Sequence, residues 1–503
     1  MRVHAPYLRR VFPIAALLSL AAIVPAQEAQ LRELPALAVA LTQQPPTIDG
    51  VLDDACWQSA AGTTGLTLLG HDRLSPRATA VWIAYDAERL YVAYVCPHTP
   101  GTDPIGLAFE RDGGKPWRED SVELFVVPDP GDPNAYYQLI ANCAGSVVDL
   151  RAGDPKWNGA WSVATSRGDS AWTAEVSIPF SELGASVPQP GAEWRGNFCR
   201  DVAAEGTANE TWADVGPSYV NPSRFGTLRF VGSAPVVRVE GLGRPDFGSL
   251  KLASAASNPT QKPQRIVLEA HIMQPGTTLT AKGEDWAEFV HGKLVTTRSE
   301  ATIPAAATQP IELEKAYTDK DLGLLVLTAK LGDGSVLYSQ HLPIHLQAPL
   351  TLSLQPIPVL KQLEVSATCG TLDEEQGKRA EVALVAVSRG DGKRVAEQTV
   401  TLAGAQAGVS LDYAQWAQGD YDIRGAVVLE GQQRETASAE FQVLPTPEWS
   451  ATASVARGSS SHPTHPWSTR AARFPAGGAR WTSVTDYCHR ASCPRRTRCS
   501  PGR

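Results

Sequence analysis

The sequence predicts an all-β protein, an antiparallel β-sandwich followed by two Ig-like β-sandwiches. Short apolar runs recur with a two-residue period, and clusters of Pro, Gly and Asp separate them, as in the strands and turns of a sandwich. The 42 Gly and 38 Pro residues suit a turn-rich chain better than a helical one. A length of 503 residues exceeds what one hydrophobic core usually serves, so we expect several domains.

The first predicted sandwich spans residues 27–235. One helical turn is expected at residues 53–57, where Asp53 can act as the N-cap. A cluster of Pro, Asp and Gly at 128–133 marks a turn between strands. The predicted strands lie at residues 78–86, 89–96, 121–129, 136–143 and 171–180.

The two Ig-like sandwiches are predicted at residues 236–348 and 349–445. Each contains a hairpin turn flanked by alternating runs, Asp333-Gly334 in the first and Asp391-Gly392 in the second. Neither contains a cluster of titratable side chains that we interpret as a site. Both are therefore expected to be spacers.

The first 26 residues are predicted to be a secretory signal peptide. Basic residues precede an apolar stretch of about 13 residues at 12–24, and small residues follow it up to Ala26. The alternative, a membrane anchor, needs a longer stretch to cross about 30 Å of hydrocarbon. We therefore expect cleavage near Ala26 and a secreted, periplasmic or cell-surface protein. Disulfides are permitted there, and zero, one or two bridges can form among Cys56, Cys96, Cys143 and Cys199.

Residues 446–503 differ in character from the rest of the chain. The last 54 residues contain nine Arg, no Lys, one acidic residue (Asp486) and three of the eight Cys. One interpretation is a disordered basic tail that binds polyanions. We favour another, that this tail is out-of-frame translation of GC-rich DNA after a frameshift near Trp449. Genomic sequence across this point decides between the two interpretations. The frameshift requires an open continuation in another reading frame, and its absence would exclude the frameshift.

Composition and motifs exclude several functions. A net charge of −8 argues against nucleic acid or an anionic membrane as the main partner. The chain contains no G-x-S-x-G nucleophile elbow, no P-loop and no dinucleotide-binding fingerprint. The chain has only two Met residues, Met1 and Met273, so it offers few ligands for a centre that needs methionine.

The candidate binding residues lie in the first sandwich. Trp117 follows a Gly/Pro-rich turn, and Trp212 lies in an irregular segment three residues after Asn209. Glu123 alternates with Val122 and Leu124 and therefore points to the opposite face of its strand, and Asn142 ends another strand. Indole rings can stack on the C–H face of a sugar while carboxylate and amide groups hold its hydroxyls. Core packing is the alternative for each Trp.

In this context residues 45–232 resemble a family 9 carbohydrate-binding module, a DOMON-like β-sandwich. The matching stretches are 48–57 (IDGVLDDACW), 84–96 (AYDAERLYVAYVC), 117–126 (WREDSVELFV), 174–184 (AEVSIPFSELG) and 221–230 (NPSRFGTLRF). The resemblance implies that two aromatic residues sandwich a sugar unit and that acidic and amide groups hold its hydroxyls. The positions that match the family's sugar contacts are Trp117, Trp212, Glu123, Asn142 and Asn209, with Gln138 or Ile140 where the family commonly has an Arg.

Cofactors are not expected, apart from structural Ca²⁺, which some members of the family bind. The oxygen donors available for it are Asp49, Asp53, Asp54 and Asp120. The expected partner is a polysaccharide or oligosaccharide, with no nucleic acid and no membrane span. The oligomeric state is left open.

The resulting hypothesis is a secreted carbohydrate-binding protein, the non-catalytic targeting front of a glycoside hydrolase that acts on O-glycosyl bonds. The alternatives are a cell-surface interaction protein with a decayed sugar site, a glycoside hydrolase in its own right using Glu119, Asp120 and Glu123, and an electron-transfer domain. Haem-binding DOMON-like relatives use an axial Met or His. The first sandwich contains no Met, and its His71 and His98 lie in loop sequence.

Overall fold

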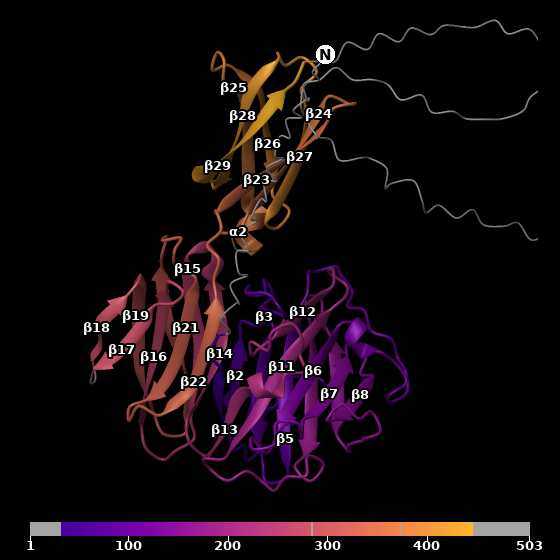
Figure 1. The fold of residues 1–503 in the computed structure, drawn as a ribbon, viewed down its shortest axis with the longest axis vertical. Coiled ribbons are helices and arrows are strands. Elements are labelled where there is room, and N and C mark those ends of the chain that lie inside the picture. The colour runs from indigo at the N-terminus through magenta and orange to yellow at the C-terminus, as the bar shows by residue number, and fades with distance from the viewer. Residues whose placement is uncertain (1–31, 283–284, 373, 446–503) are drawn as a thin grey trace, which may run out of the picture. The chain divides into compact units, whose positions relative to one another are not determined.

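The structure is a computed structural model that describes residues 32–282, 285–372 and 374–445. It is built almost entirely of strands, which confirms the all-β prediction (Figure 1). The predicted signal peptide and basic tail lie outside the described residues. The two α-helices among the described residues are short, α1 (Ala55–Ser59) and α2 (Glu374–Arg379).

Two sheets pack face to face to form the first sandwich. One contains strands β1 (Ala36–Ala40), β13 (Gly226–Gly232), β11 (Glu193–Val202), β6 (Ser121–Val127), β7 (Tyr137–Asn142) and β8 (Val147–Arg151), joined at β11 by β12 (Ala208–Thr211), which also pairs with β3 (Thr67–Leu68). The other contains β2 (Ala61–Thr64), β4 (Ala80–Tyr85), β5 (Arg89–Pro97), β10 (Ala171–Pro179) and β9 (Ser162–Arg167).

Both sheets continue into the strands of the second predicted sandwich. β1 pairs antiparallel with β22 (Val336–Pro343), and β2 pairs in parallel with β14 (Val236–Arg244). The remaining strands are β15 (Ser249–Asn258), β16 (Gln264–Met273), β17 (Thr278–Lys282), β18 (Asp285–His291), β19 (Leu294–Ile303), β20 (Ala307–Ala316) and β21 (Leu324–Leu331). One cluster of buried apolar side chains spans both sets of strands, so the first two sandwiches share a core. The domain boundary at residues 235 and 236 stays a prediction.

The third set of strands has its own core. β23 (Leu350–Ile357), β24 (Gln362–Cys369) and β27 (Gln406–Asp412) form one sheet, and β25 (Ala380–Ser388), β26 (Arg394–Thr401), β28 (Gly419–Leu429) and β29 (Gln432–Val443) form the other. The predicted hairpin turns are confirmed. Asp333-Gly334 joins the paired strands β21 and β22, Asp391-Gly392 joins β25 and β26, and both glycines have positive φ.

The segment 48–57 is fastened to the β5–β10 face by one buried carboxylate. Glu175 on β10 accepts hydrogen bonds from the backbone N–H of Asp49 and Gly50 and from Nε1 of Trp57. The N-cap of α1 is Asp54 and not Asp53, and the Asp54 carboxylate accepts the backbone N–H of Thr47 instead of an N–H of the helix. The helix begins one residue later than predicted, because Asp54 has an extended backbone, with φ −62° and ψ 145°, and therefore lies outside the helix.

Gly50 permits this close approach, and its replacement is a test of it. Its φ is +86°, and a Cβ there would lie 2.7 Å from the carbonyl carbon of Thr165. We expect Gly50→Ala to lower the free energy of unfolding by about 2–3 kcal/mol, through backbone strain and crowding together. Chemical denaturation of the full chain measures it.

Gly191→Ala is the matched control for this substitution. Gly191 has a similar φ of +92°, but nothing lies within 4 Å of the added Cβ. Gly191→Ala should therefore lower the free energy of unfolding by about 1 kcal/mol, through backbone strain alone. Equal losses in the two variants would contradict the close approach at Gly50.

Candidate functional site

Alternation along the strands gives the first sandwich a polar outer face. Val122, Leu124 and Val126 of β6 point into the shared core, so Ser121 and Glu123 point to the opposite side. We call this side of β6, β7, β11 and β12 the outer face. Its polar side chains include Glu123, Gln138, Asp201 and Asn209.

Strand register and hydrogen bonds fix the places of these side chains. Gln138 Nε2 donates to Glu123 Oε2 at 2.7 Å. Asp201 pairs with Ser121 across β11 and β6, and Ser121 Oγ donates to Asp201 Oδ2 at 2.9 Å. Asn209 pairs with Asp201 across β12 and β11, and it is half-buried, as is Gln138. Gln138 and Asn209 therefore reach solvent while Glu123 and Asp201 lie beneath the surface.

The segment 213–225 explains why the two carboxyl groups are buried. It covers the neighbouring part of the outer face and forms a small apolar cluster with Phe125 and Cys199. Tyr219 in this segment donates its hydroxyl to Asp201 Oδ1 at 3.3 Å. Glu123 is 2 % exposed and Asp201 is 3 % exposed. Burial raises the pKa of Glu123 to about 7 and raises the pKa of Asp201 well above its usual range.

Trp117 lies beside this face on a short 3-10 helix, η1 (Pro116–Arg118), which contacts β6, β7 and β11. Pro116 is buried, whereas Trp117 is 42 % exposed. Leu107, in the neighbouring loop, is also exposed. An indole of this kind offers a flat apolar surface next to hydrogen-bonding groups.

Glu119, Asp120 and Asn142 hold the loop that carries Trp117. Asn142 Nδ2 donates to Glu119 Oε2 at 2.6 Å and to the carbonyl of Leu107 at 2.8 Å, and its Oδ1 accepts two backbone N–H groups. Asp120 accepts the backbone N–H groups of Ile105, Ala203 and Ala204. The hydrogen-bonding capacity of Asn142 is therefore used within the protein.

Trp212 lies on the other side of the sheet. It is 2 % exposed and belongs to the shared core, with its ring centroid 5.1 Å from that of Phe198. Thr211 Oγ1 contacts Asn197 on the outer face, so the next side chain, Trp212, points inward. The structure therefore does not bring Trp117 and Trp212 together on one face.

Three of the four donors considered for calcium accept hydrogen bonds within the protein. Asp49 accepts the backbone N–H of Val51, while Asp54 and Asp120 accept the N–H groups named above. In the described ranges, no group of three or more His, Cys, Asp or Glu side chains could hold a metal ion. The expectation of structural Ca²⁺ stays a prediction, and no proposal below uses it.

None of the cysteines in the described residues forms a disulfide. Cys56, Cys96, Cys143, Cys199 and Cys369 are all buried free thiols. Burial raises the pKa of Cys96 to about 12 and that of Cys143 to about 11, so both stay protonated at neutral pH.

Within residues 32–282, 285–372 and 374–445, no helix is long and apolar enough to cross a membrane.

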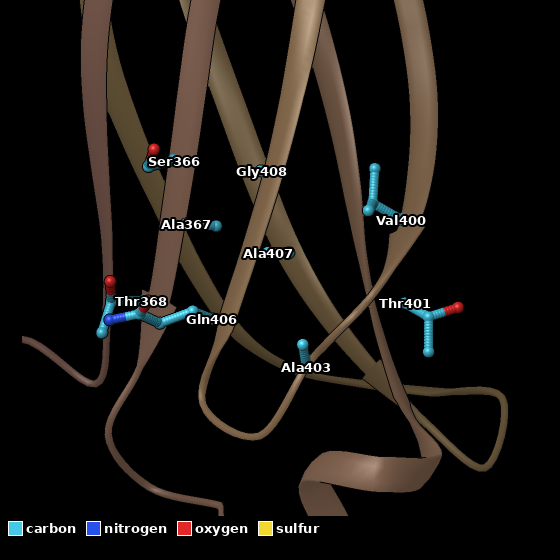
Figure 2. A pocket seen from close by; sticks show the side chains of 9 residues that line it. All are labelled: Ser366, Ala367, Thr368, Val400, Thr401, Ala403, Gln406, Ala407 and Gly408. Atoms are coloured by element: carbon cyan, nitrogen blue, oxygen red, sulfur yellow. The ribbon is translucent and has the colours of Figure 1, made fainter. Parts of the chain in front are cut away.

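A hollow of about 660 Å³ lies in the third sandwich, between β24, β26 and β27. Figure 2 shows its polar side chains, Ser366, Thr368, Thr401 and Gln406, among Ala, Val and Gly. None of the lining side chains is titratable or aromatic. It does not resemble the polar face beside Trp117.

An exposed indole beside carboxyl and amide groups on one face of a sandwich is an arrangement that suits a ligand-binding module. Residues 48–233 match the family model described as "Carbohydrate family 9 binding domain-like". This segment is therefore a domain of that family, which confirms the resemblance seen in the sequence.

Similar proteins are distant and cover part of this chain. It is 24 % identical over 196 residues to endo-1,4-beta-xylanase A of Thermotoga neapolitana, and the match covers 37 % of this chain and 17 % of the xylanase. A putative carbohydrate-binding protein of Bacteroides uniformis is 21 % identical, with 39 % of this chain and 100 % of that chain covered and a TM-score of 0.33. A family 9 module of Caldicellulosiruptor kristjanssonii, solved with cellotriose, is 19 % identical, with 39 % and 94 % covered and a TM-score of 0.30.

Sequence reasoning missed Asp201 and Tyr219 on the outer face. A signal for Asp201 was present, because Asn197, Cys199 and Asp201 alternate with Phe198 and Arg200 in the run 197–201. That pattern places an acidic side chain on the same face as Cys199. It does not reveal that Cys199 pairs with Glu123.

Proposed function

We propose that this protein binds carbohydrate on the outer face of its first sandwich, beside Trp117. The observation that supports this most strongly is the exposed Trp117 ring on η1, which contacts the strands β6 and β7 that carry Glu123 and Gln138, within a segment of the family 9-like group. The indole would stack on the C–H face of a sugar ring while the polar side chains hold its hydroxyls.

We propose a single aromatic platform and not a sandwich of two indoles. Trp212 and Asn142 then act as supports, Trp212 in the core and Asn142 beneath the loop that carries Trp117. An open platform of this kind gives modest affinity, in the range of about micromolar to millimolar dissociation constants. The bound sugar contacts Trp117 from one side only.

The same geometry favours binding over hydrolysis. A glycosidase needs two carboxyl groups on either side of the scissile bond, about 5–10 Å apart. Glu123 and Asp201 are buried and accept hydrogen bonds from Gln138 and Ser121, and Glu119 and Asp120 accept N–H groups of the protein. Each of these four carboxyl groups is therefore already held by a hydrogen bond within the protein.

We further propose that the protein is secreted and targets a linked or neighbouring glycoside hydrolase to its polysaccharide. Support comes from the predicted signal peptide and from the similarity to part of a xylanase. A weakly binding module acts here by raising the local concentration of substrate for a catalytic domain.

Calorimetric titration of the full chain with glucose, xylose, cellobiose and xylobiose tests this proposal. We expect saturable binding to at least one sugar, and at least a tenfold loss of affinity, about 1.4 kcal/mol, in Trp117→Ala. The fold should stay intact, because Trp117 is on the surface.

Leu360→Ala is the matched control, since Leu360 is exposed and lies in the turn between β23 and β24 of the third sandwich. It should bind as the unmodified protein does. Binding that survives unchanged in Trp117→Ala would refute the platform. No binding to any sugar by folded protein would instead favour the interaction-protein alternative.

A further inference from the structure

Two apolar side chains are exposed in the loop segment 105–109, beside the segment 114–120 that carries Trp117. Ile105 is 47 % exposed and Leu107 is 65 % exposed. We call these two side chains the apolar strip. A single exposed apolar side chain is ordinary, whereas a contiguous apolar surface marks a binding site. The contacts between the two segments show that the strip and Trp117 belong to one surface.

Hydrogen bonds join the two segments at one end. The Ile105 N–H donates to Asp120 Oδ2 at 2.8 Å, and the Asp120 N–H donates to the Ile105 carbonyl at 2.8 Å. The Leu107 N–H donates to Glu119 Oε2 at 2.9 Å. The loop segment therefore runs antiparallel to the segment that carries Trp117.

A ring contact joins the same segments at the other end. The Phe109 ring lies against Gly114, where an added Cβ would be 2.4 Å from the ring. Trp117 follows Gly114 by three residues and precedes the contact of Leu107 by two. The indole is thus bracketed in sequence by contacts with Phe109 on one side and Leu107 on the other.

The residue between the two members of the strip faces the protein. An added Cβ on Gly106 would lie 2.6 Å from Cys143 Sγ, which is buried. Ile105 and Leu107, on either side of Gly106, are the side chains that reach solvent. The strip is therefore an outward surface with its back packed on the sandwich.

The backbone polar groups of the strip are already engaged. Asp120 uses both the N–H and the carbonyl of Ile105, Glu119 accepts the N–H of Leu107, and Asn142 Nδ2 donates to the Leu107 carbonyl at 2.8 Å. A sugar ring over the strip would lay its hydroxyls against apolar groups, and a hydroxyl that loses water without a partner is destabilising. A hydrocarbon group gains free energy from the same contact.

The size of the strip limits its occupant further. A stable protein interface uses about 20–30 residues of each partner, far more than two side chains. Ile105 and Leu107 are two residues apart, about 6–7 Å along an extended backbone. A short alkyl chain or one aromatic ring covers that span.

We propose that the apolar strip binds an apolar substituent of the sugar, an alkyl, acyl or aryl group, while the sugar ring stacks on Trp117. This inference rests on the proposed function and narrows its ligand to glycosides or sugar esters that carry such a group. Ile105 and Leu107 are then specificity-determining residues. They favour substituted sugars over bare ones without adding a hydrogen bond.

Calorimetric titration of the full chain with methyl, butyl and hexyl β-D-glucosides, and with the same series of β-D-xylosides, tests this inference. All are used below the concentrations at which they form micelles. We expect affinity to rise by about twofold to fourfold for each added CH₂, the factor for half to full burial of that group. The hexyl glycoside should therefore bind at least tenfold more tightly than the methyl glycoside. Equal affinities would overturn the inference.

Leu107→Asn places a polar group of similar size on the strip, and we expect it to lose most of the gain between methyl and hexyl glycosides. Val359→Asn is the matched control, because Val359 is 92 % exposed in the turn between β23 and β24 of the third sandwich. It should keep the whole gain. An undiminished gain in Leu107→Asn, or an equal loss in Val359→Asn, would contradict a role of the strip.

Two further probes separate failure of this inference from failure of sugar binding. Methyl and hexyl glycosides that bind equally well refute the strip and leave the sugar site standing. 1-Hexanol that binds as tightly as the hexyl glycoside refutes the sugar site and leaves an apolar site. No binding by any glycoside refutes both. A gain of cellobiose over methyl β-D-glucoside that disappears in Leu107→Asn would assign the strip to a second sugar unit instead.

Discussion

Trp212→Ala is expected to lower the free energy of unfolding by about 3–5 kcal/mol. The indole fills space between Phe198 and Gly226, where even an added Cβ on Gly226 would lie 2.4 Å from the ring. Removing so large a buried side chain loses its transfer free energy and leaves a cavity. Urea denaturation of the full chain, monitored by circular dichroism, measures the loss.

Trp212→Phe separates packing from hydrogen bonding at this position. In the part of the chain that the structure describes, Trp212 Nε1 is buried without a hydrogen-bond partner. The Phe variant should therefore cost less than the Ala variant, since it keeps most of the ring and loses no hydrogen bond. A Trp212→Ala variant that is as stable as the unmodified protein would show that the ring is not in the core.

Glu175→Ala is also expected to lower the free energy of unfolding by about 3–5 kcal/mol, for a different reason. The Glu175 carboxylate is buried and accepts two backbone N–H groups and the indole N–H of Trp57, at distances of 2.7–3.0 Å. The Ala variant leaves these donors buried without an acceptor, and each costs about 1–3 kcal/mol, in part relieved by local rearrangement. The segment 48–57 should come loose from the sheet, with a shift of the Trp57 fluorescence.

Glu175→Gln is the control for charge against hydrogen bonding. It keeps one acceptor oxygen, so it should lose less stability than Glu175→Ala. Thr47 N–H is held by Asp54 and not by Glu175, and its hydrogen exchange should change less than that of Asp49 and Gly50. Equal stability of the Ala variant and the unmodified protein would contradict the anchoring role.

The candidate site could be predicted in part. The alternation of Glu123 with two apolar residues predicts that its side chain points away from theirs, and the structure places it on the outer face. The Gly/Pro-rich turn before Trp117 indicates an exposed loop, and Trp117 is exposed. Trp212 lies in an irregular segment, where no periodicity fixes the direction of a side chain. The structure places its ring in the core.

The sequence by itself determined the class of the fold, since a two-residue period and its turns act locally and specify strands without reference to distant residues. The motifs at 48–57 and 117–126 predicted the resemblance of the first sandwich to family 9, which the family model confirms for residues 48–233. Only the tertiary structure decided that β1 pairs with β22, that Trp212 packs on Phe198 and that Asp201 lies on the same face as Glu123. Each of these features depends on strand register and sheet packing. Both are set by side chains throughout the core, so they cannot be predicted from any single segment.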